Sequence, residues 1–235
     1  MIVRRVAAVA AALMLGLIAS CDSLPGKPKE SDRPISPSQV KSFAVLYDQN
    51  CAGCHGADGR FGAACELANP TYQALIDDAT LTRIVSQGVP GTVMPPFAQK
   101  AGGYLSDAQV AIVIDGMRHR WKTGSPLQDA PPYAGAGGDP ARGGQVFAQS
   151  CASCHGPEGK GGPKAPGSIV DPSYLMLVSD QALRTLTIAG RADLGHPDWR
   201  GYPGQPLTAQ QIADVVAWIA AKRPRFAPGA YARNP

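Results

Sequence analysis

The chain has 235 residues and a formal net charge of +4, from 22 basic and 18 acidic side chains. The net charge is small and the basic residues are scattered along the chain, which excludes a nucleic-acid-binding surface, because such a surface needs clustered basic charge. Aromatic residues make up only 6% of the chain, which also has 27 glycines and 22 prolines. Two domains of under about 100 residues with this composition would have thin protein cores. We therefore expect a non-protein group to contribute to the core.

Residues 1–20 have the pattern of a secretory signal peptide, because Arg4 and Arg5 precede an apolar run of small and branched side chains. The run is too short to be a safe membrane span. Without the two arginines the mature chain keeps 20 basic and 18 acidic side chains, a net charge of +2. That balance does not predict the charge of a partner.

A lipid anchor is expected directly after this leader. Residues 18–21 read IASC and resemble a bacterial lipobox, in which Cys21 becomes the lipidated first residue of the mature protein. The alternative is an ordinary signal peptide that is cut near Ala19, with no lipid on Cys21. Asp22, directly after the cysteine, resembles the signal that keeps a lipoprotein at the inner membrane. Several acyl chains anchor a protein firmly, since each buried methylene contributes about 0.8 kcal/mol. The sequence thus predicts a protein on the periplasmic side of the bacterial inner membrane, with the proline-rich residues 21–37 as an extended tether.

The rest of the chain contains one pattern twice. The motif CAGCHG at residues 51–56 recurs as CASCHG 100 residues later, and the segments downstream of it align at an offset of 102. This repeat predicts a first domain at residues 38–123, a linker at 124–138, a second domain at 139–225 and a tail at 226–235. The linker has a stiff Pro-Pro part and a Gly-rich part that we expect to be flexible.

Both domains are predicted to be all-α, because helical periodicity recurs and no period-two strand pattern is found. A short helix precedes each cysteine motif. Middle helices are expected to begin near Asp78 and Asp180 and to end on glycine. A longer terminal helix in each domain should start after Ser106 or Thr208, which are good N-cap residues.

The CxxCH motif places two cysteines about one helical turn apart, with a histidine directly after them. Thiol addition across two porphyrin vinyl groups needs this arrangement, and the histidine supplies an axial iron ligand, so the motif is typical of c-type haem attachment. A zinc site would need a second ligand pair beside each cluster, and a thioredoxin-like redox motif would need strands around it. The sequence therefore predicts two covalently bound haems c (Fe). Their thioether cysteines and first iron ligands are Cys51, Cys54 and His55 in the first domain and Cys151, Cys154 and His155 in the second.

Each repeat resembles a class I, mitochondrial-type cytochrome c domain, and the likeness covers about residues 38–225. It rests on CxxCHG, on a Leu-Ser/Thr helix start and on a Met-Pro pair in the expected place. The resemblance implies a few helices wrapped around a haem, whose volume would complete the thin cores. It also implies that Met94, which is followed by Pro95, is the sixth iron ligand of the first haem, with Met117 of the terminal helix as its rival.

The second repeat departs from this pattern at the sixth ligand. At the offset of 102, Met94 aligns with His196, and Pro197 still follows the ligand position. We therefore expect His155 and His196 to ligate the second iron; a surface role for His196 and ligation by Met176 are the alternatives. Imidazole stabilises ferric iron better than a thioether does, so the second haem is expected to have the lower potential.

Cys65 lies outside these motifs. It follows the first haem-binding stretch closely and is expected to be a small, partly buried thiol. A disulfide to another chain and thiol ligation of iron are the alternatives.

These features predict a membrane-anchored carrier of single electrons, either a free shuttle or a subunit of a respiratory or photosynthetic complex. Its redox partners would be a membrane electron-transfer complex, a soluble cytochrome or a terminal oxidase. The alternative is an enzyme with an open or labile haem, such as a dihaem peroxidase or a sulfur-compound dehydrogenase. Both irons have candidate sixth ligands and no acid/base cluster flanks them, so electron transfer is favoured and no catalytic residue is expected.

Overall fold

The computed structural model describes residues 26, 28–29, 32–121, 127–202 and 205–224. The expected signal peptide, Cys21 and the tail from residue 226 lie outside the described residues. The chain divides into two compact units, residues 1–39 and 40–235. In the first unit the structure describes one short 3-10 helix, η3 (Pro37–Gln39). None of the described helices is both long enough and apolar enough to cross a membrane.

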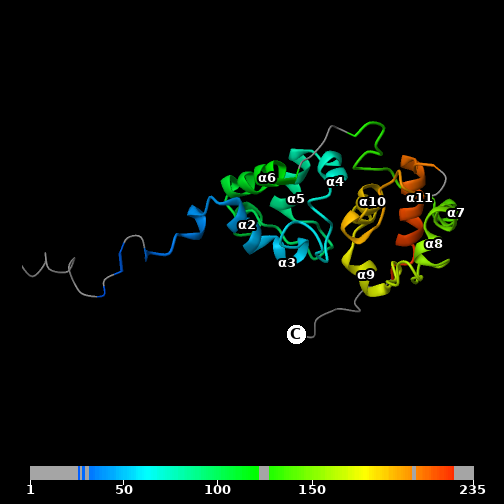
Figure 1. The fold of residues 1–235 in the computed structure, drawn as a ribbon, viewed down its shortest axis with the longest axis horizontal. Helices are drawn as coiled ribbons and strands as arrows, with labels where there is room; N and C mark the ends of the chain where they lie inside the picture. The colour runs from blue at the N-terminus through cyan, green and yellow to red at the C-terminus, as the bar shows by residue number, and fades with distance from the viewer. Residues whose placement is uncertain (1–25, 27, 30–31, 122–126, 203–204, 225–235) are drawn as a thin grey trace, which may run out of the picture. The chain divides into compact units, whose positions relative to one another are not determined.

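The second unit is built from helices (Figure 1). Its first half contains α2 (Phe43–Asn50), α3 (Ala52–His55), α4 (Pro70–Leu75), α5 (Asp78–Gln87), η4 (Gln99–Ala101) and α6 (Asp107–Trp121). Its second half contains α7 (Pro140–Ser150), α8 (Ala152–His155), α9 (Pro172–Leu177), α10 (Asp180–Ala189), η5 (Ala192–Leu194) and α11 (Ala209–Ala220). The part of the chain that the structure describes contains isolated backbone bridges but no strand, so the all-α prediction is confirmed.

The capping residues of the terminal helices behave as the sequence predicts. The Thr208 hydroxyl accepts the backbone N–H of Gln211, whose side chain accepts the N–H of Thr208, which forms a complete capping box. Ser106 and Gln109 exchange the same pair of hydrogen bonds at the start of α6. The middle helices α5 and α10 also begin and end where expected, and each is followed by a glycine.

Two short helices, α4 and α9, were not expected from periodicity. Asn69 and Asp171 cap them, and each side-chain oxygen accepts the backbone N–H groups two and three residues further on. A proline occupies the first helical position of each, where its missing N–H costs nothing. The Asn-Pro and Asp-Pro pairs were therefore the available signal, because helices of six residues are too short to show a period.

The first and last helices of each half cross at a glycine. A Cβ on Gly143 of α7 would lie 1.9 Å from the backbone oxygen of Asp214 in α11, so only glycine permits this approach. In the first half the glycine is on the other helix, because a Cβ on Gly116 of α6 would lie 2.2 Å from the ring of Phe43 in α2. The two halves thus reach the same close crossing from opposite sides.

The buried carboxylate of Asp214 ties α11 to the start of α7. It accepts hydrogen bonds from Arg142 Nε at 2.8 Å and Nη2 at 3.0 Å, from the backbone N–H of Asp139 at 2.7 Å and from Gln210 Nε2 at 2.9 Å. The Arg142 guanidinium holds the pKa of Asp214 well below its usual range. A carboxyl group whose pKa is lowered by folding stabilises the fold above its unfolded pKa, and this contribution is lost as the pH falls.

We expect Asp214→Asn to lower the free energy of unfolding at pH 7 by about 1.5–3 kcal/mol, the range for a charged hydrogen bond. Urea unfolding at pH 7 and pH 3 measures the effect. The difference from the natural chain should shrink at pH 3, because the carboxylate contribution fades below the unfolded pKa of about 3.9. Asp115→Asn is the control, since Asp115 is exposed and, among the described residues, forms an ion pair only with exposed His119. An equal loss in both variants would contradict the assignment.

The described part of the linker contacts α10 and α11 at several points. Arg184 of α10 is buried and donates from Nη2 to the carbonyl of Pro132 at 2.8 Å. A Cβ on Gly135 would lie 2.5 Å from the Arg184 side chain, and one on Gly138 would lie 2.0 Å from the backbone oxygen of Ala213. These contacts hold the chain at Gly135 and Gly138, and the flexibility of the Gly-rich part remains a prediction. Its glycines allow close approach of the backbone to α10 and α11.

The two halves of the second unit share apolar packing. Ala189 of α10 belongs to the buried cluster of the first half, and Leu75 of α4 packs against the cluster of the second. Tyr133 of the linker also packs against the first cluster. The two halves are therefore joined by side-chain packing as well as by the chain itself.

Candidate functional site

The first CxxCH motif lies on the single turn of α3. His55 Nδ1 is 2.9 Å from the backbone oxygen of Cys65. Because a carbonyl only accepts hydrogen bonds, Nδ1 must donate, which leaves Nε2 as the unprotonated nitrogen that can bind a metal. Burial lowers the pKa of His55, so its imidazole is neutral at pH 7, as a metal ligand must be.

The second CxxCH motif lies on α8, and its histidine faces a second histidine. The ring centres of His155 and His196 are 5.8 Å apart. Two metal–nitrogen bonds of about 2 Å each, together with the distance from each ring centre to its nitrogen, come close to that separation. Burial lowers the pKa of both imidazoles, which favours their neutral, ligating form. The Nδ1 atoms of both rings are buried and lack a hydrogen-bond partner among the described residues.

The two loops that carry the expected sixth ligands are built alike. Gly88 and Gly190 end the preceding helices with φ of +67° and +72°, a region that favours glycine. The residue after each glycine donates its N–H to the carbonyl of Met94 or His196, at 3.1 Å in both cases. A Cβ on either glycine would lie 2.6 Å from that same carbonyl oxygen. The alignment at an offset of 102 therefore corresponds to the same backbone hydrogen bond and the same close glycine contact, with a different side chain at the ligand position.

Met117 and Met176, the rival ligand candidates, have different surroundings from Met94. Met117 is fully buried in the apolar cluster of the first half. Met176 lies on α9 with 43% of its surface exposed. Met94 is partly buried in the loop after α5. The structure thus brings His155 and His196 together, and the assignment of Met94 to the first iron remains a prediction.

The cysteines are suited to attachment rather than to dithiol redox chemistry. The five described cysteines are all free thiols. Burial raises the pKa of Cys51 to about 11 and that of Cys151 to about 12, whereas redox-active dithiols need a lowered pKa. Cys65 is partly buried with Sγ 3.9 Å from His55 Nδ1, and burial raises its pKa to about 11. Its thiol is therefore protonated at pH 7.

The donor set fits a haem better than a bare metal ion. Within the described ranges, no group of three or more His, Cys, Asp or Glu side chains is arranged to hold a metal ion. His155 and His196 supply two neighbouring imidazole rings, and Cys151 and Cys154 come directly before the first of them. A haem provides the in-plane nitrogens that this pair lacks, and its vinyl groups are the partners that the thiols need.

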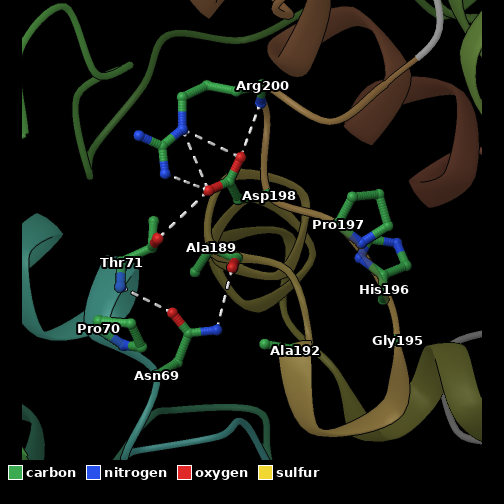
Figure 2. Close-up of a pocket in the computed structure, with 10 residues that line it drawn as sticks. All are labelled: Asn69, Pro70, Thr71, Ala189, Ala192, Gly195, His196, Pro197, Asp198 and Arg200. Carbon is green, nitrogen blue, oxygen red and sulfur yellow. Dashed lines mark hydrogen bonds and ion pairs between the residues drawn. The ribbon is translucent and has the colours of Figure 1, made fainter.

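The loop that carries His196 also borders the first half. A cleft of about 400 Å³ lies between this loop and the start of α4, and Figure 2 shows the residues that line it. On its wall Thr71 Oγ1 donates to Asp198 Oδ2 at 3.4 Å, and Asp198 is paired with Arg200. The His196 ring lies away from this polar cluster in Figure 2. The loop therefore presents its imidazole toward His155 and its polar residues toward the first half.

Sequence reasoning missed the residues that join the two halves. Arg191 and Asp193 lie at the start of η5 and form hydrogen bonds to the segment that follows the first CxxCH motif. Arg191 donates to the carbonyl of Ala64 in that segment, and the backbone N–H of Asp193 donates to the carboxylate of Glu66. The available signal was a difference between the repeats. At the offset of 102, these charged residues align with Val89, Gly91 and Ser168.

Comparison with known proteins agrees with this geometry. Residues 140–222 match the family model "Cytochrome c", and residues 38–115 match "Cytochrome C oxidase, cbb3-type, subunit III". The chain is 30% identical over 146 residues to a thiosulfate dehydrogenase of Stutzerimonas stutzeri, covering 57% of this chain and 47% of that protein. It is 30% identical over 188 residues to the cbb3-type cytochrome c oxidase subunit FixP of Bradyrhizobium sp., covering 73% and 58%.

A further relative is the cytochrome bc1 complex cytochrome c subunit of Mycobacterium tuberculosis, 22% identical over 202 residues, covering 83% of this chain and 68% of that subunit. The chain spans about half of the length of the thiosulfate dehydrogenase and of FixP. The two matched regions each contain one CxxCH motif within the all-α fold. The chain therefore belongs to the c-type cytochromes, as a dihaem member with two tandem cytochrome c domains that each bind a haem c covalently.

Proposed function

We propose that this dihaem cytochrome carries single electrons between redox proteins of a respiratory chain. The observation that carries the proposal is the opposed pair of His155 and His196, with ring centres 5.8 Å apart. A pair of axial imidazoles fills both free positions of an iron, which suits electron transfer and leaves no position for a substrate. The relatives in cbb3-type oxidases and in the cytochrome bc1 complex support the same class of function.

The protein residues set where the electron is more stable. A haem bound at each site would supply one-electron chemistry, between ferric and ferrous iron. The thioether of Met94 favours the ferrous state, whereas the imidazole of His196 favours the ferric state, so the second haem has the lower potential. With both haems bound, electrons would enter at the haem that His155 and His196 hold and leave from the haem that His55 and Met94 hold. A redox titration that gave two equal potentials would contradict this order.

We further propose that the protein acts on the periplasmic face of the inner membrane. The support for this location is the leader at residues 1–20, the lipobox cysteine Cys21 and the proline-rich residues 21–37. Its redox partners would be a membrane electron-transfer complex, a soluble cytochrome or a terminal oxidase. In this arrangement the lipid holds the chain near membrane complexes while the tether gives it reach.

Haem content and ligand binding test the proposal together. The purified protein should contain two haems per chain by pyridine haemochrome, reduce a soluble cytochrome c, and show no spectral change when carbon monoxide is added to the reduced form. Cys151→Ser with Cys154→Ser should leave one haem per chain, because both thioether bonds of the second haem are removed. Cys65→Ser is the matched control and should keep two. The proposal fails if the natural chain holds fewer than two haems or transfers no electron to the cytochrome.

The thiosulfate dehydrogenase relative supports one other candidate, an enzyme that oxidises a sulfur compound. Such an enzyme would need an iron position that a substrate can reach, so the same protein would bind carbon monoxide and be reduced by thiosulfate alone. Neither result is expected with His196 on the second iron. Both results together would favour the enzyme.

A further inference from the structure

A cluster of charged side chains is buried where the two haem domains meet. Arg191 and Asp193 come from the loop that carries His196, and Glu66 comes from the segment after the first CxxCH motif. Their side chains are 13%, 0% and 3% exposed. Arg191 binds Asp193 through two parallel hydrogen bonds of 2.8 Å, and the guanidinium lowers the pKa of Asp193 to about 2. Both groups are therefore charged at neutral pH.

This ion pair grips the backbone of the first domain. Arg191 donates from Nη1 to the carbonyl of Ala64 at 2.9 Å and from Nη2 to that of Gly62 at 3.0 Å. Asp193 accepts the N–H of Phe61 at 2.7 Å and donates its own N–H to Glu66 at 3.2 Å. Phe61 has a φ of +59°, which is uncommon for a residue with a bulky side chain. Its strained backbone is thus held by an acceptor from the other domain.

Arg191 connects the ligand histidine of one haem to that of the other. Arg191 donates a hydrogen bond to the carbonyl of Ala64, the residue before Cys65. The carbonyl of Cys65 in turn accepts the hydrogen bond from His55. The main chain of Arg191 exchanges two hydrogen bonds with that of His196, at 3.1 Å and 2.9 Å. A displacement of this single residue would therefore move the second haem's distal ligand relative to the first haem's proximal one.

The repeat shows that these charges are not needed to build a haem domain. The positions of Arg191 and Asp193 hold Val89 and Gly91 in the first domain, and that of Glu66 holds serine in the second. Each charge is present only in the copy in which it reaches the other domain. Asn69 behaves in the same way, because its amide also donates to the carbonyl of Ala189, which the aligned Asp171 cannot do.

We propose that Arg191 is a positioning residue that locks the His196 loop onto the segment beside His55, so that the two haems exchange electrons within one rigid unit. The inference rests on the proposed electron-transfer function and adds how the two sites work together. Buried, bidentate and charged hydrogen bonds are the strong ones, and they leave little freedom of orientation. Two domains that merely shared a linker would instead react with partners independently.

Arg191→Gln tests this role, with Arg223→Gln as the matched control. Arg223 makes a similar set of bonds to two backbone carbonyls and to Asp180, but all within the second domain. Flash reduction followed by optical detection gives the rate of electron exchange between the haems, and its independence from protein concentration identifies transfer within one chain. We expect this rate to fall about tenfold in Arg191→Gln, because loss of several charged hydrogen bonds lowers the docked population. In Arg223→Gln it should not change.

Pulsed EPR measures the distance between the two ferric irons. If Arg191 only stabilised the fold, this distance distribution would not change in the variant. The iron–iron distance distribution should be narrow in the natural chain and in Arg223→Gln, and broad in Arg191→Gln. Should Arg191→Gln fail to bind two haems, Asp193→Asn, which weakens the same junction, should give the same broadening and slower exchange.

An unchanged rate and an unchanged distance distribution in variants that hold two haems would overturn this inference. That outcome is distinct from failure of the proposed function, in which the natural chain itself would pass no electron to a soluble cytochrome.

Discussion

Replacing His196 with alanine is expected to leave the second haem without its sixth ligand. The imidazole faces His155 with ring centres 5.8 Å apart. The hydrogen bond from the Arg191 N–H to the His196 carbonyl holds the loop in place, and it does not involve the imidazole. The loop should therefore keep its shape while the iron loses a strong-field nitrogen. Low-temperature EPR of the oxidised protein should show one low-spin signal replaced by a high-spin signal. The reduced variant should bind one carbon monoxide per chain, whereas the natural chain binds none.

Met176→Ala is the control for this experiment, because Met176 is the other candidate for the same iron. It lies on α9 with 43% of its surface exposed, and its loss should change neither the EPR signals nor carbon monoxide binding. His196→Met should restore a six-coordinate iron and raise its potential on the order of 0.1 V, within the roughly 0.8 V over which axial ligands set haem potentials. An EPR spectrum that His196→Ala leaves unchanged would show that another residue holds the iron.

Gly143→Ala is expected to separate the two helices that close the second domain. Its Cβ would lie 1.9 Å from a backbone oxygen of α11 and 2.9 Å from the Cβ of Trp218, and neither atom can move without shifting the helix. Overpacking of this kind costs typically 1–3 kcal/mol and more where backbone must move, so we expect a loss of about 3 kcal/mol. Urea unfolding measures the loss, and the haem content per chain shows whether the second domain still matures.

Gly137→Ala is the matched control. A Cβ there meets nothing within 4 Å, so its added methyl group should leave the free energy of unfolding within about 0.5 kcal/mol of the natural value. If Gly143→Ala were as stable as this control, the close crossing of α7 and α11 would not be the contact that holds the second domain together.

The internal repeat predicted most of what the two domains share, and the limit of that prediction is visible in one pair of arginines. Arg118 donates hydrogen bonds around the connection between α4 and α5, and Arg223 does the same between α9 and α10. Each arginine bonds to two backbone carbonyls and one aspartate. The acceptors are Gln73, Ile76 and Asp78 in the first domain and Leu175, Val178 and Asp180 in the second. These acceptors align at an offset of 102, but the arginines differ by 105. Long side chains reach one place from different positions, so alignment could not pair them.

The sequence by itself determined the all-α class and the helix starts at Ser106 and Thr208, and it predicts the residues that attach the haems. These features depend on neighbours within a few positions, because thioether spacing, helical periodicity and capping are all local. The repeat had already predicted the pair of His155 and His196, but the tertiary structure alone decided that Arg191 joins the loop of one haem domain to the segment that follows the CxxCH motif of the other. Those contacts join residues far apart in the chain, and their partners are mostly backbone groups, which every residue type carries and no sequence pattern marks.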